Sequence, residues 1–315
     1  MVKTPPLLVI VGPTGVGKTA VAVRLGQRLP MEIVSADSRQ VYRDMDIGTG
    51  KPTPAERAAV SHHLLDLIRP DERYHAARFR REALEAITSI QSRGKLPVVV
   101  GGTGLYVRAL LKGLDAAPPA DPALRSSLES LAREEGNGAL HARLASLDPP
   151  AAARLHPNDR VRLIRALEKH AGGGGSKVSR GGSWGRSTSP WRLLAIGLTR
   201  ERHTLNQSLK VRVEGMVTRG MMGEVRRLLA AGYDAGSPGM NGIGYRQFVA
   251  VLRGQLDEAE AVRLMVRDTQ RYAKRQLTWF QRDAEIHWLD VDRAGGSEGT
   301  AEAIGKLFTR EGWIE

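Results

Sequence analysis

The segment Leu7-Leu8-Val9-Ile10-Val11-Gly12-Pro13-Thr14-Gly15-Val16-Gly17-Lys18-Thr19 decides the fold of this chain. Its apolar first part is typical of a buried strand, and residues 12–19 match the phosphate-binding pattern G-x-x-x-x-G-K-[ST]. A helix-compatible run, residues 19–25, follows directly, as that motif requires. Glycines let successive backbone N–H groups turn toward one anion, and the positive end of a helix adds to the attraction. The sequence therefore predicts a phosphate or pyrophosphate site at this turn.

Two features indicate the kind of chemistry: the residues at the end of this loop, and the lack of an acidic residue after the later apolar strand. Lys18 supplies a positive charge for phosphate oxygens, and the Thr19 hydroxyl is placed to coordinate a magnesium ion. A nucleotide-hydrolysing machine usually has a second apolar strand that ends in an acidic metal ligand. The best later strand, Pro97–Val100, runs instead into Gly-Gly-Thr-Gly at residues 101–104. We therefore interpret the loop as part of a transferase, in which the phosphate chain belongs to a substrate or leaving group.

The composition narrows the class of protein. The chain has 315 residues, 41% of them hydrophobic, which suffices for one large domain or two ordinary ones. An excess of 47 Lys and Arg over 34 Asp and Glu gives a net charge of +13, which favours polyanionic partners. Cysteine is absent, so disulfides and thiol chemistry are excluded. No signal peptide and no membrane-length apolar run is found, and we expect a cytoplasmic protein that needs to be no more than a monomer.

Strand and helix patterns alternate along residues 1–112, which we expect to form the first part of an α/β catalytic core. This alternation predicts a parallel sheet flanked by helices on both faces. The expected strands are Leu7–Val11, Glu32–Ser35 and Pro97–Val100, and the expected helices are Thr19–Arg28, Ala76–Arg93 and Leu105–Leu111.

The pattern changes between residues 113 and 190. Arg-, Glu-, Leu- and Ala-rich stretches there predict an all-helical insertion domain, and its Gly- and Ser-rich last part, residues 172–189, predicts a mobile loop. Strand character returns at Arg192–Leu198, a long helix is expected at Asp257–Arg282, and Ile286–Leu289 is a plausible last strand. Residues 191–315 should therefore complete the catalytic core.

Two polar side chains are expected beside the phosphate loop. Asp37 follows the second expected strand and Thr103 follows the third, and ligands in open α/β sheets bind beyond the carboxyl ends of strands. Asp37 could act as a general base or a magnesium ligand, or it could simply cap a helix. Thr103 could donate a hydrogen bond to a leaving-group oxygen, or it could cap the next helix.

Basic residues recur with helical spacing in two places. Arg160, Arg162 and Arg165 share one expected helix, and Arg263, Arg267, Arg271 and Arg275 recur every four residues on another. Such stripes are often only solvated faces, but the positive net charge favours contact with nucleic acid. The pair His62-His63 has no further ligand at metal-binding spacing, and we interpret it as structural or as the start of a helix.

Taken together, a series of short blocks resembles one known family. The chain is similar to the bacterial tRNA dimethylallyltransferases, also called tRNA isopentenyltransferases, from Leu7 to Asp290. The blocks are the phosphate loop, Ser-Ala-Asp-Ser-Arg-Gln-Val-Tyr at 35–42, Met-Asp-Ile-Gly-Thr-Gly-Lys-Pro at 45–52, His-His-Leu-Leu-Asp at 62–66, Val-Gly-Gly-Thr-Gly-Leu-Tyr at 100–106, His-Pro-Asn-Asp at 156–159, Gly-Ile-Gly-Tyr-Arg-Gln at 242–247 and Ala-Lys-Arg-Gln at 273–276.

The resemblance implies a P-loop sheet and a reaction. The dimethylallyl group of dimethylallyl diphosphate passes to the N6 amine of the adenosine directly 3′ of the tRNA anticodon (tRNA position 37), diphosphate leaves, and Mg²⁺ assists. The base is turned out of the anticodon loop into a channel. Asp37 would take a proton from the amine, and Thr103 would hydrogen-bond the bridging oxygen. The diphosphate would be held by Arg212 and by the loop Gly12, Pro13, Thr14, Gly15, Val16, Gly17, Lys18 and Thr19.

The resemblance also implies which residues contact tRNA, with the helical insertion gripping the anticodon stem-loop. These residues are Asp37, Ser38, Arg39, Gln40, Thr103, Arg125, Val161, Arg162, Leu163, Ile164, Arg165, Asn241, Gly242, Ile243, Gly244, Tyr245 and Arg246. The chain departs from the family pattern at residues 171–190, where relatives have a more ordered segment, and at Asn241, where many relatives have another residue.

Three other readings stay open from the sequence. One is an adenylate-type isopentenyltransferase that acts on free nucleotides, and the basic insertion argues against it. Another is a P-loop small-molecule kinase, which would transfer phosphate from ATP. The third is a non-catalytic RNA-binding protein, against which the intact Lys18, Thr19, Asp37 and Thr103 argue.

Overall fold

The computed structural model describes residues 4–114, 121–173, 189–310 and 312–313. They divide into two compact units, one made of residues 1–113 with 183–315 and one made of residues 114–182. Part of the segment expected to be a mobile loop, residues 174–188, lies outside the described residues. Within the described ranges, every helix is too short or too polar to cross a lipid bilayer.

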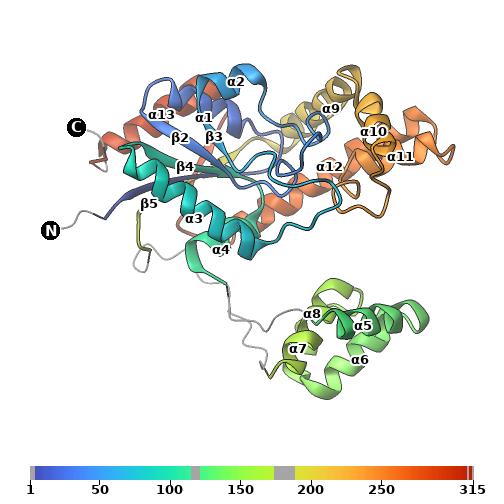
Figure 1. Ribbon diagram of the computed structural model, residues 1–315. Helices are drawn as coiled ribbons and strands as arrows, with labels where there is room; N and C mark the ends of the chain where they lie inside the picture. The colour runs from blue at the N-terminus through green and yellow to red at the C-terminus, as the bar shows by residue number, and fades with distance from the viewer. Residues whose placement is uncertain (1–3, 115–120, 174–188, 311, 314–315) are drawn as a thin grey trace. The chain divides into compact units, whose positions relative to one another are not determined.

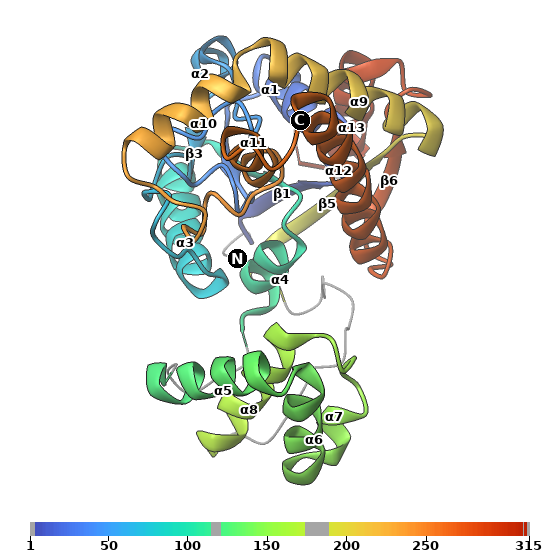
Figure 2. The same cartoon turned by 90° about the vertical axis from the view of Figure 1, so that its right-hand side faces the viewer.

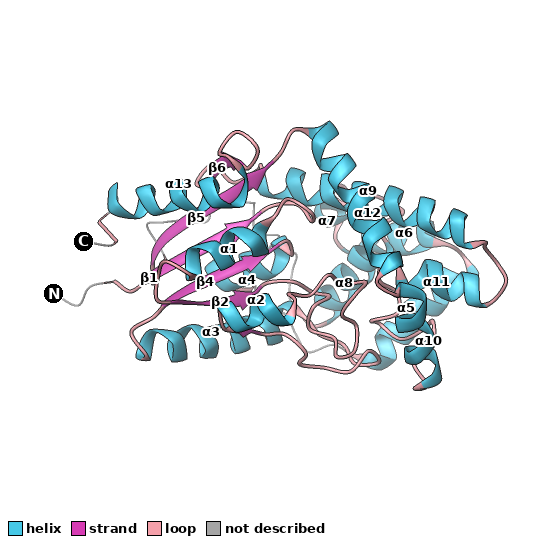
Figure 3. Ribbon diagram, turned by 90° about the horizontal axis from the view of Figure 1, so that it is seen from above, coloured by secondary structure: helices cyan, strands magenta, loops and turns pink. Residues whose placement is uncertain are grey.

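The larger unit is built on a six-stranded sheet with the strand order β3-β2-β4-β1-β5-β6. All neighbouring strands are parallel, and Figure 3 shows them side by side among the helices. The strands are β1 (Pro6–Val11), β2 (Met31–Ser35), β3 (His62–His63), β4 (Leu96–Gly101), β5 (Arg192–Thr199) and β6 (His287–Asp290). The predicted parallel sheet with flanking helices is therefore confirmed. Of the two interpretations of His62-His63, the start of a helix is wrong: the pair is a short edge strand paired with Ile33 and Val34, which agrees with the structural interpretation.

Both faces of the sheet are covered, which explains why its central strands are continuously apolar. In β1, Leu7 and Val9 face a core shared with the helices α3 (Ala76–Ser92) and α4 (Gly104–Lys112). Leu8 and Ile10 face the opposite core, shared with α1 (Lys18–Gly26) and α13 (Gly296–Arg310). Figure 1 shows α1 and α13 above the sheet and α3 and α4 below it.

A helical layer lies beyond the strands in the same unit, and Figure 2 shows it in front of the sheet. Its helices are α9 (Arg202–Thr218), α10 (Met221–Ala230), α11 (Tyr245–Leu252) and α12 (Glu258–Phe280), and the short α2 (Pro54–Ala59) precedes β3. A third core joins these helices to the segment after β2 through residues such as Val41, Met45, Met216 and Phe248. This core fixes the chain between β2 and α2 against the helical layer.

Helices are the only regular secondary structure among the described residues of the smaller unit. It consists of α5 (Pro122–Glu134), α6 (Asn137–Leu147), α7 (Pro149–Ala152) and α8 (Arg160–Ala171) around its own core, which includes Leu128, Leu140, Leu144, Leu163 and Leu167. Asp121 and Asp159 accept hydrogen bonds from the first turns of α5 and α8, which sets where these helices begin. The expected all-helical insertion is thus what the structure contains.

Candidate functional site

The carboxyl ends of three neighbouring strands bring the predicted residues to one edge of the sheet. Val11 at the end of β1 pairs in register with Gly101 of β4, and Ser35 at the end of β2 pairs with Val100. The phosphate loop, the segment that begins at Ala36 and the turn before α4 therefore leave the sheet side by side. This is the edge at which ligands of open α/β sheets bind.

The glycines of the phosphate loop are required by its backbone and by close packing. Gly12 has φ of 147°, and a Cβ there would lie 2.5 Å from the carbonyl oxygen of Leu198. Gly15 has φ of 77°, and a Cβ there would overlap the side chain of Leu209. Because L-residues with side chains rarely adopt these angles, only glycine lets the loop close over the start of α1. The loop therefore has the geometry that the motif predicts.

Two cations converge on this loop. The Lys18 ammonium donates hydrogen bonds to the carbonyl oxygens of Gly12 (2.9 Å) and Pro13 (2.8 Å). Burial lowers the pKa of Lys18 to about 8, Asp37 opposes this shift and Arg212 adds to it. Burial also lowers the pKa of Arg212, again opposed by Asp37. The site therefore concentrates positive charge in a poorly hydrated place, which suits a polyanion such as a diphosphate.

Arg212 reaches the site because a neighbouring residue has no side chain. It comes from α9 and lies against Gly50, where a Cβ would overlap the guanidinium. Gly50 has φ of 60°, so both its backbone angle and its close approach favour glycine. The block of residues 45–52 thus shapes the floor on which Arg212 lies.

Asp37 and Thr103 lie beside the loop and are connected through the backbone of residues 38–40. Asp37 Oδ1 accepts hydrogen bonds from the N–H groups of Arg39 (2.8 Å) and Gln40 (3.4 Å), in a turn that does not continue into a helix. Thr103 Oγ1 accepts from the N–H of Ser38 (3.0 Å) and makes no capping hydrogen bond to α4, which starts after it. Since its oxygen is the acceptor in that bond, the Thr103 hydroxyl hydrogen can still donate, and Tyr272 is its hydrogen-bond partner within the protein.

A buried amide, Gln276 of α12, joins the two loops. Its Oε1 accepts from the Thr14 N–H at 2.8 Å, and its Nε2 donates to the Gly102 carbonyl at 2.9 Å. The side chain therefore sets the distance between the phosphate loop and the turn that presents Thr103. Gln276 was not among the predicted site residues. Two signals pointed to it: it ends the family block at residues 273–276, and it is a polar residue on a helix face that is otherwise buried, between Ala273 and Phe280.

The loop of residues 46–48 is held by a second buried side chain. The Glu224 carboxylate, 1% exposed, accepts from the N–H groups of Asp46 (2.9 Å), Ile47 (2.8 Å) and Gly48 (3.1 Å). Its Oε1 also accepts from the Tyr245 hydroxyl at 2.6 Å. Burial and the Glu224 charge raise the pKa of Tyr245 well above its ordinary range. Tyr245 is therefore a fixed, neutral wall of the site.

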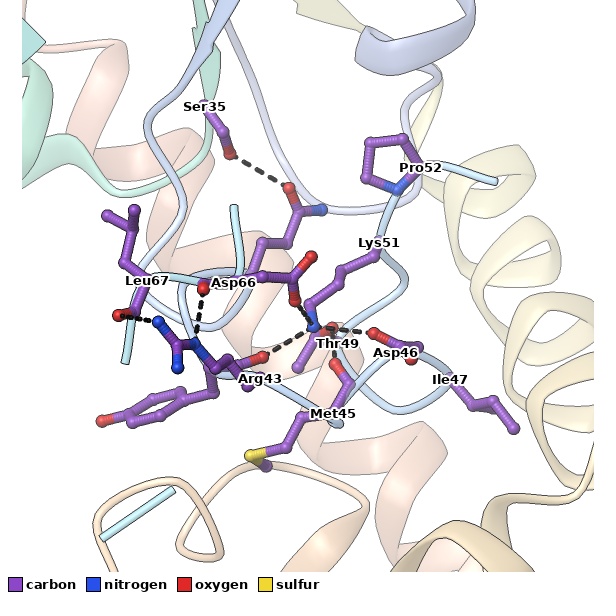
Figure 4. A network of polar contacts seen from close by, with 12 residues as sticks. Ser35, Arg43, Met45, Asp46, Ile47, Thr49, Lys51, Pro52, Asp66 and Leu67 are labelled. Carbon is purple, nitrogen blue, oxygen red and sulfur yellow. Dashed lines mark hydrogen bonds and ion pairs between the residues drawn. The ribbon is translucent and has the colours of Figure 1, made fainter. Parts of the chain in front are cut away.

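A lysine network fixes the same loop from its other side (Figure 4). The buried Lys51 ammonium donates to the Tyr42 carbonyl (2.6 Å) and to the carboxylates of Asp46 (2.7 Å) and Asp66. Burial alone would raise the pKa of Asp66, but the hydrogen bonds from Lys51 and Arg57 outweigh it and lower that pKa. The segment of residues 42–51 is therefore clamped between Glu224 and Lys51.

Two cavities meet at Asp37. The first has a volume of about 40 Å³ and is lined by Lys18, Thr19, Ile33, Ser35, Asp37, Gln40, Pro52, His62, Val100 and Gly101. The second, of about 290 Å³, is lined by Thr14, Asp37, Ser38, Arg39, Gly48, Thr49, Arg212, Val213, Met216, Asn241, Gly242, Ile243, Tyr245, Arg246, Met265, Thr269, Tyr272 and Arg275. The larger cavity combines an apolar wall with cations and the Asp37 carboxylate. It brings together the predicted segments 37–39 and 241–246, which are about two hundred residues apart in sequence.

Tyr272 lies in the wall of the larger cavity. Burial raises its pKa to about 12, the Asp37 charge adds to this shift, and Arg39 and a hydrogen bond with Thr103 oppose it. Of the neighbouring predicted residues, Asn241 and Arg246 are exposed, whereas Gly242, Gly244 and Tyr245 are buried. Arg246 forms an ion pair with Asp268 at 2.5 Å.

The predicted residues of the insertion fall into two groups. Val161 is 79% exposed and Arg162 is also exposed, whereas Leu163 and Ile164 lie in the core of this unit. Arg125 forms a two-fold hydrogen-bonded pair with the buried Glu168 (2.7 and 3.0 Å), and Arg165 approaches the same carboxylate at 3.1 Å. Leu163 and Ile164 therefore position α8 from within, and Arg125 ties α5 to α8.

The stripe on α12 is partly neutralised. Arg263 pairs with Glu260 at 2.6 Å and Arg267 with Asp268 at 3.1 Å. Arg275 lies over the ring of Tyr272, with 5.8 Å between the guanidinium carbon and the ring centroid, and it lines the larger cavity. Only the end of the stripe nearest Asp37 therefore contributes to the site.

The fold and the site define a P-loop α/β protein whose loop is built to hold a phosphate chain, and comparison with known proteins gives its family. A family model described as IPP transferase matches residues 40–283. The chain is 50% identical over 284 residues to tRNA dimethylallyltransferase 2 of Geotalea uraniireducens, covering 90% of this chain and 92% of that protein. It is 46% identical to tRNA dimethylallyltransferase of Thermomicrobium roseum over 99% of this chain and 94% of that one. The chain belongs to the IPP transferase family, as its motifs indicated.

Comparison with solved structures supports the same family. The full-length tRNA isopentenylpyrophosphate transferase of Bacillus halodurans is 39% identical, covers 98% of both chains and gives a TM-score of 0.70. A eukaryotic dimethylallyltransferase acting on tRNA is 27% identical, covers 98% of this chain and 80% of its own, and gives a TM-score of 0.79. The fold of the chain is thus shared with solved members of the family.

Proposed function

We propose that this protein transfers the dimethylallyl group of dimethylallyl diphosphate to N6 of the adenosine at tRNA position 37 and releases diphosphate. One observation carries the proposal: Asp37 lines both the small cavity beside Lys18 and the larger, partly apolar cavity. A carboxylate at that junction lies between a site for a diphosphate and a site that suits a base and a prenyl chain. The family membership agrees with this reading.

In this proposal the leaving group is held before the reaction begins. The N–H groups of the phosphate loop, the Lys18 ammonium and the Arg212 guanidinium bind the diphosphate oxygens. The bond between the allylic carbon and the bridging oxygen breaks, and the N6 nitrogen forms a bond to that carbon. Diphosphate takes the electron pair of the broken bond, and the Thr103 hydroxyl donates a hydrogen bond to the bridging oxygen as its charge grows.

Asp37 is the proton acceptor for the attacking amine. Its Oδ1 is fixed by the N–H groups of Arg39 and Gln40, which orients the carboxylate at the mouth of the larger cavity. The N6 proton passes to this carboxylate as the nitrogen–carbon bond forms, so the prenylated amine is neutral and the Asp37 carboxyl carries the proton until it is released. Tyr245, held by Glu224, and Tyr272 supply rigid aromatic walls beside it.

The residues present fit a divalent cation that is shared with the substrate. Among the described residues, no three His, Cys, Asp or Glu side chains are grouped closely enough to hold a metal alone. Mg²⁺ bound to phosphates typically takes only one or two protein oxygens, and the Thr19 hydroxyl and Asp37 carboxylate line one small cavity at the loop. We propose that Thr19 holds Mg²⁺, which would neutralise charge on the leaving diphosphate.

We propose that tRNA binds through the exposed residues of both units. The lining of the larger cavity offers the exposed Asn241, Arg246 and Arg275 and the half-buried Arg39. Helix α8 of the insertion offers Val161 and Arg162, and Arg165 is partly exposed. The net charge of +13 supports binding of the anticodon stem-loop phosphates. We propose that the protein acts as a monomer in the cytoplasm.

A transfer assay tests the proposal. The protein is mixed with Mg²⁺, radiolabelled dimethylallyl diphosphate and an anticodon stem-loop that has A at position 37, and a copy with G there is the matched control. Label should appear only in the RNA with A. Label on AMP would instead indicate the free-nucleotide enzyme, and transfer of phosphate from ATP to a small molecule would indicate the kinase.

A further inference from the structure

His62 has one ring nitrogen that the protein uses and one that it leaves buried. Its Nδ1 lies 2.7 Å from the carbonyl oxygen of Val60, and since a carbonyl can only accept, Nδ1 carries the hydrogen. Its Nε2 is buried and has no hydrogen-bond partner among the described residues. Because Nδ1 is the donor, Nε2 of the neutral ring is an acceptor that a well-satisfied interior would match with a donor.

The neighbouring histidine, His63, has a partner for its Nε2, so a buried ring nitrogen without a partner is not a general feature of the strand. His63 Nε2 lies 2.6 Å from the Glu32 carboxylate, which Arg93 (2.7 Å) and Lys95 (2.9 Å) also contact. Successive residues of a strand point to opposite faces, so the two rings face different surroundings. His63 is part of an ion network, whereas His62 lines the small cavity beside the phosphate loop.

The small cavity is large enough and polar enough to hold a water molecule. Its volume is about 40 Å³, whereas a buried water requires roughly 10–15 Å³ and between about two and four polar partners. Thr19, Ser35, Asp37, Gln40 and His62 all contribute polar side chains to the lining.

The hydrogen bonds around the cavity determine how such a water would be oriented. The Ser35 hydroxyl donates to Gln40 Oε1 (3.0 Å), and Gln40 Nε2 donates to the Gly50 carbonyl (3.2 Å). These two hydrogens are therefore not available to the cavity, whereas Gln40 Nε2 keeps a second hydrogen that can be donated to another acceptor. The Asp37 carboxylate and His62 Nε2 can only accept, so a molecule between them must donate its hydrogens to them. Its oxygen lone pairs then remain for a positive charge.

We propose that His62 is a positioning residue of the diphosphate site: its Nε2 accepts a hydrogen bond from a single buried water that also donates to Asp37. The oxygen of this water faces the divalent cation that Thr19 would hold at the phosphate loop. The inference rests on the proposed function, because it assigns that cavity to the diphosphate site. In nucleotide-hydrolysing proteins, an acidic residue at the end of a strand holds the metal ion. Here His62 of the edge strand would act on the metal site through a water molecule, as an outer partner that orients a metal ligand.

Two substitutions separate the two ring nitrogens. In His62→Asn the side-chain amide nitrogen replaces Nδ1 and keeps the bond to Val60, but nothing replaces Nε2. In His62→Gln the amide oxygen can take the place of Nε2 and accept from the water, but the donor to Val60 is lost. His63→Gln is the control on the opposite face of the strand. Thermal unfolding of each full-length variant confirms that it is folded.

The measurement is the dissociation constant of Mn²⁺ in the presence of inorganic pyrophosphate, followed by the electron paramagnetic resonance signal of free Mn²⁺. His62→Asn should weaken binding about 10-fold, the lower end of what loss of an outer partner of a metal ligand costs. His62→Gln and His63→Gln should remain close to the unsubstituted protein. A high-resolution crystal structure with Mn²⁺ and pyrophosphate should show a water within hydrogen-bond distance of His62 Nε2.

The outcomes are distinguishable. If the unsubstituted protein binds no Mn²⁺ with pyrophosphate, the proposed diphosphate site and this inference are both wrong. If it binds but His62→Asn binds equally well, or if Asn and Gln weaken binding equally, the site stands and the role of His62 is wrong. A crystal structure with no water at Nε2 would also overturn the inference.

Discussion

Each of the two units contains a nearly buried carboxylate, and the two are used differently. Glu224 in the α/β unit is 1% exposed and accepts hydrogen bonds from three backbone N–H groups and a tyrosine hydroxyl. Glu168 in the insertion is 4% exposed and accepts from the guanidinium groups of Arg125 and Arg165. The first fixes a loop at the site, and the second fixes two helices through cations.

This difference shows which charged side chains each unit uses to hold its fold and which it leaves for a ligand. Around the site, the loops are held by the Gln276 amide, the Glu224 carboxylate and the Lys51 ammonium. These contacts do not use Lys18 or Arg212, whose charges remain for a ligand. In the insertion, some arginines are used to hold the fold, and Arg162 is left exposed for a partner. We therefore expect the chemical step to depend on the α/β unit and the binding of RNA to depend more on the insertion.

The largest expected effect is that of Asp37→Asn on the chemical step. Asparagine keeps an oxygen that can accept from the Arg39 N–H, but it cannot take the proton of the amine. The single-turnover rate should fall by about 10²–10⁴-fold, the usual contribution of a general base. Affinity for the stem-loop, measured by fluorescence anisotropy, should be unchanged. An equal loss of affinity would show that Asp37 mainly positions the RNA.

Thr103→Ala should have the next largest effect. The hydroxyl is the group that we expect to donate to the leaving oxygen, and losing one such donor typically slows the chemical step about 10²-fold. The variant also leaves the Ser38 N–H without its acceptor. Thr103→Ser is therefore the control, because it keeps the hydroxyl and should retain most of the rate. An unchanged single-turnover rate for Thr103→Ala would remove this residue from the mechanism.

Sequence alone predicted the parts of the site that are local in the chain. The phosphate loop is a continuous motif, and the strands that precede it and Gly101 are continuously apolar because both faces of the sheet are covered. The edge strand at His62-His63 was missed, since two paired residues are too few to show any pattern. For Asp37, the sequence left open a helix cap, and the structure shows a non-helical turn instead.

The parts that the sequence could not predict depend on distant pairs. Gln276 bonds Thr14 across 262 residues, and Glu224 bonds Asp46 across 178 residues. Neither residue belongs to a motif whose spacing implies a contact, so only the folded chain shows what it holds. Likewise, the sequence could not separate the exposed Val161 and Arg162 from the buried Leu163 and Ile164 before the helix face was known.

Replacing the two buried carboxylates by neutral amides should lower the free energy of unfolding by different amounts. In Glu224→Gln, one carboxylate oxygen becomes an NH₂ group that faces donors, and buried unmatched donors cost about 1–3 kcal/mol each. In Glu168→Gln, Arg125 and Arg165 can turn toward water because both are partly exposed, so the cost should be about 1 kcal/mol. Hydrogen exchange measures the loss of stability around Glu224 in residues 45–50 and the loss around Glu168 in residues 160–171. Equal losses of protection would contradict the comparison.

Acid should weaken the insertion through Glu168. Burial alone would raise the pKa of Glu168, but hydrogen bonds from Arg125 and Arg165 outweigh it and lower that pKa below the ordinary value of 4.5. The stabilisation is therefore fully present above about pH 4.5 and is lost as the pH falls through the lowered value. Protection of residues 160–171 should fall in this range and should not do so in Glu168→Gln. The same decline in both proteins would assign the acid sensitivity to other groups.

The smallest expected effect is that of Arg162→Ala on RNA binding. Arg162 is exposed and only loosely paired with Asp159 at 3.4 Å, so its loss should leave the insertion folded. If it contacts one phosphate, the slope of log K against log salt should decrease in magnitude by about 1, and the single-turnover rate at saturating RNA should be unchanged. Arg133→Ala removes the same charge from another exposed position of the insertion. Equal effects of the two variants would mean that the insertion acts through its overall charge, whereas a larger effect of Arg162→Ala would place the RNA along α8. A slower chemical step in Arg162→Ala would contradict the expectation that the insertion contributes to RNA binding and not to the chemical step.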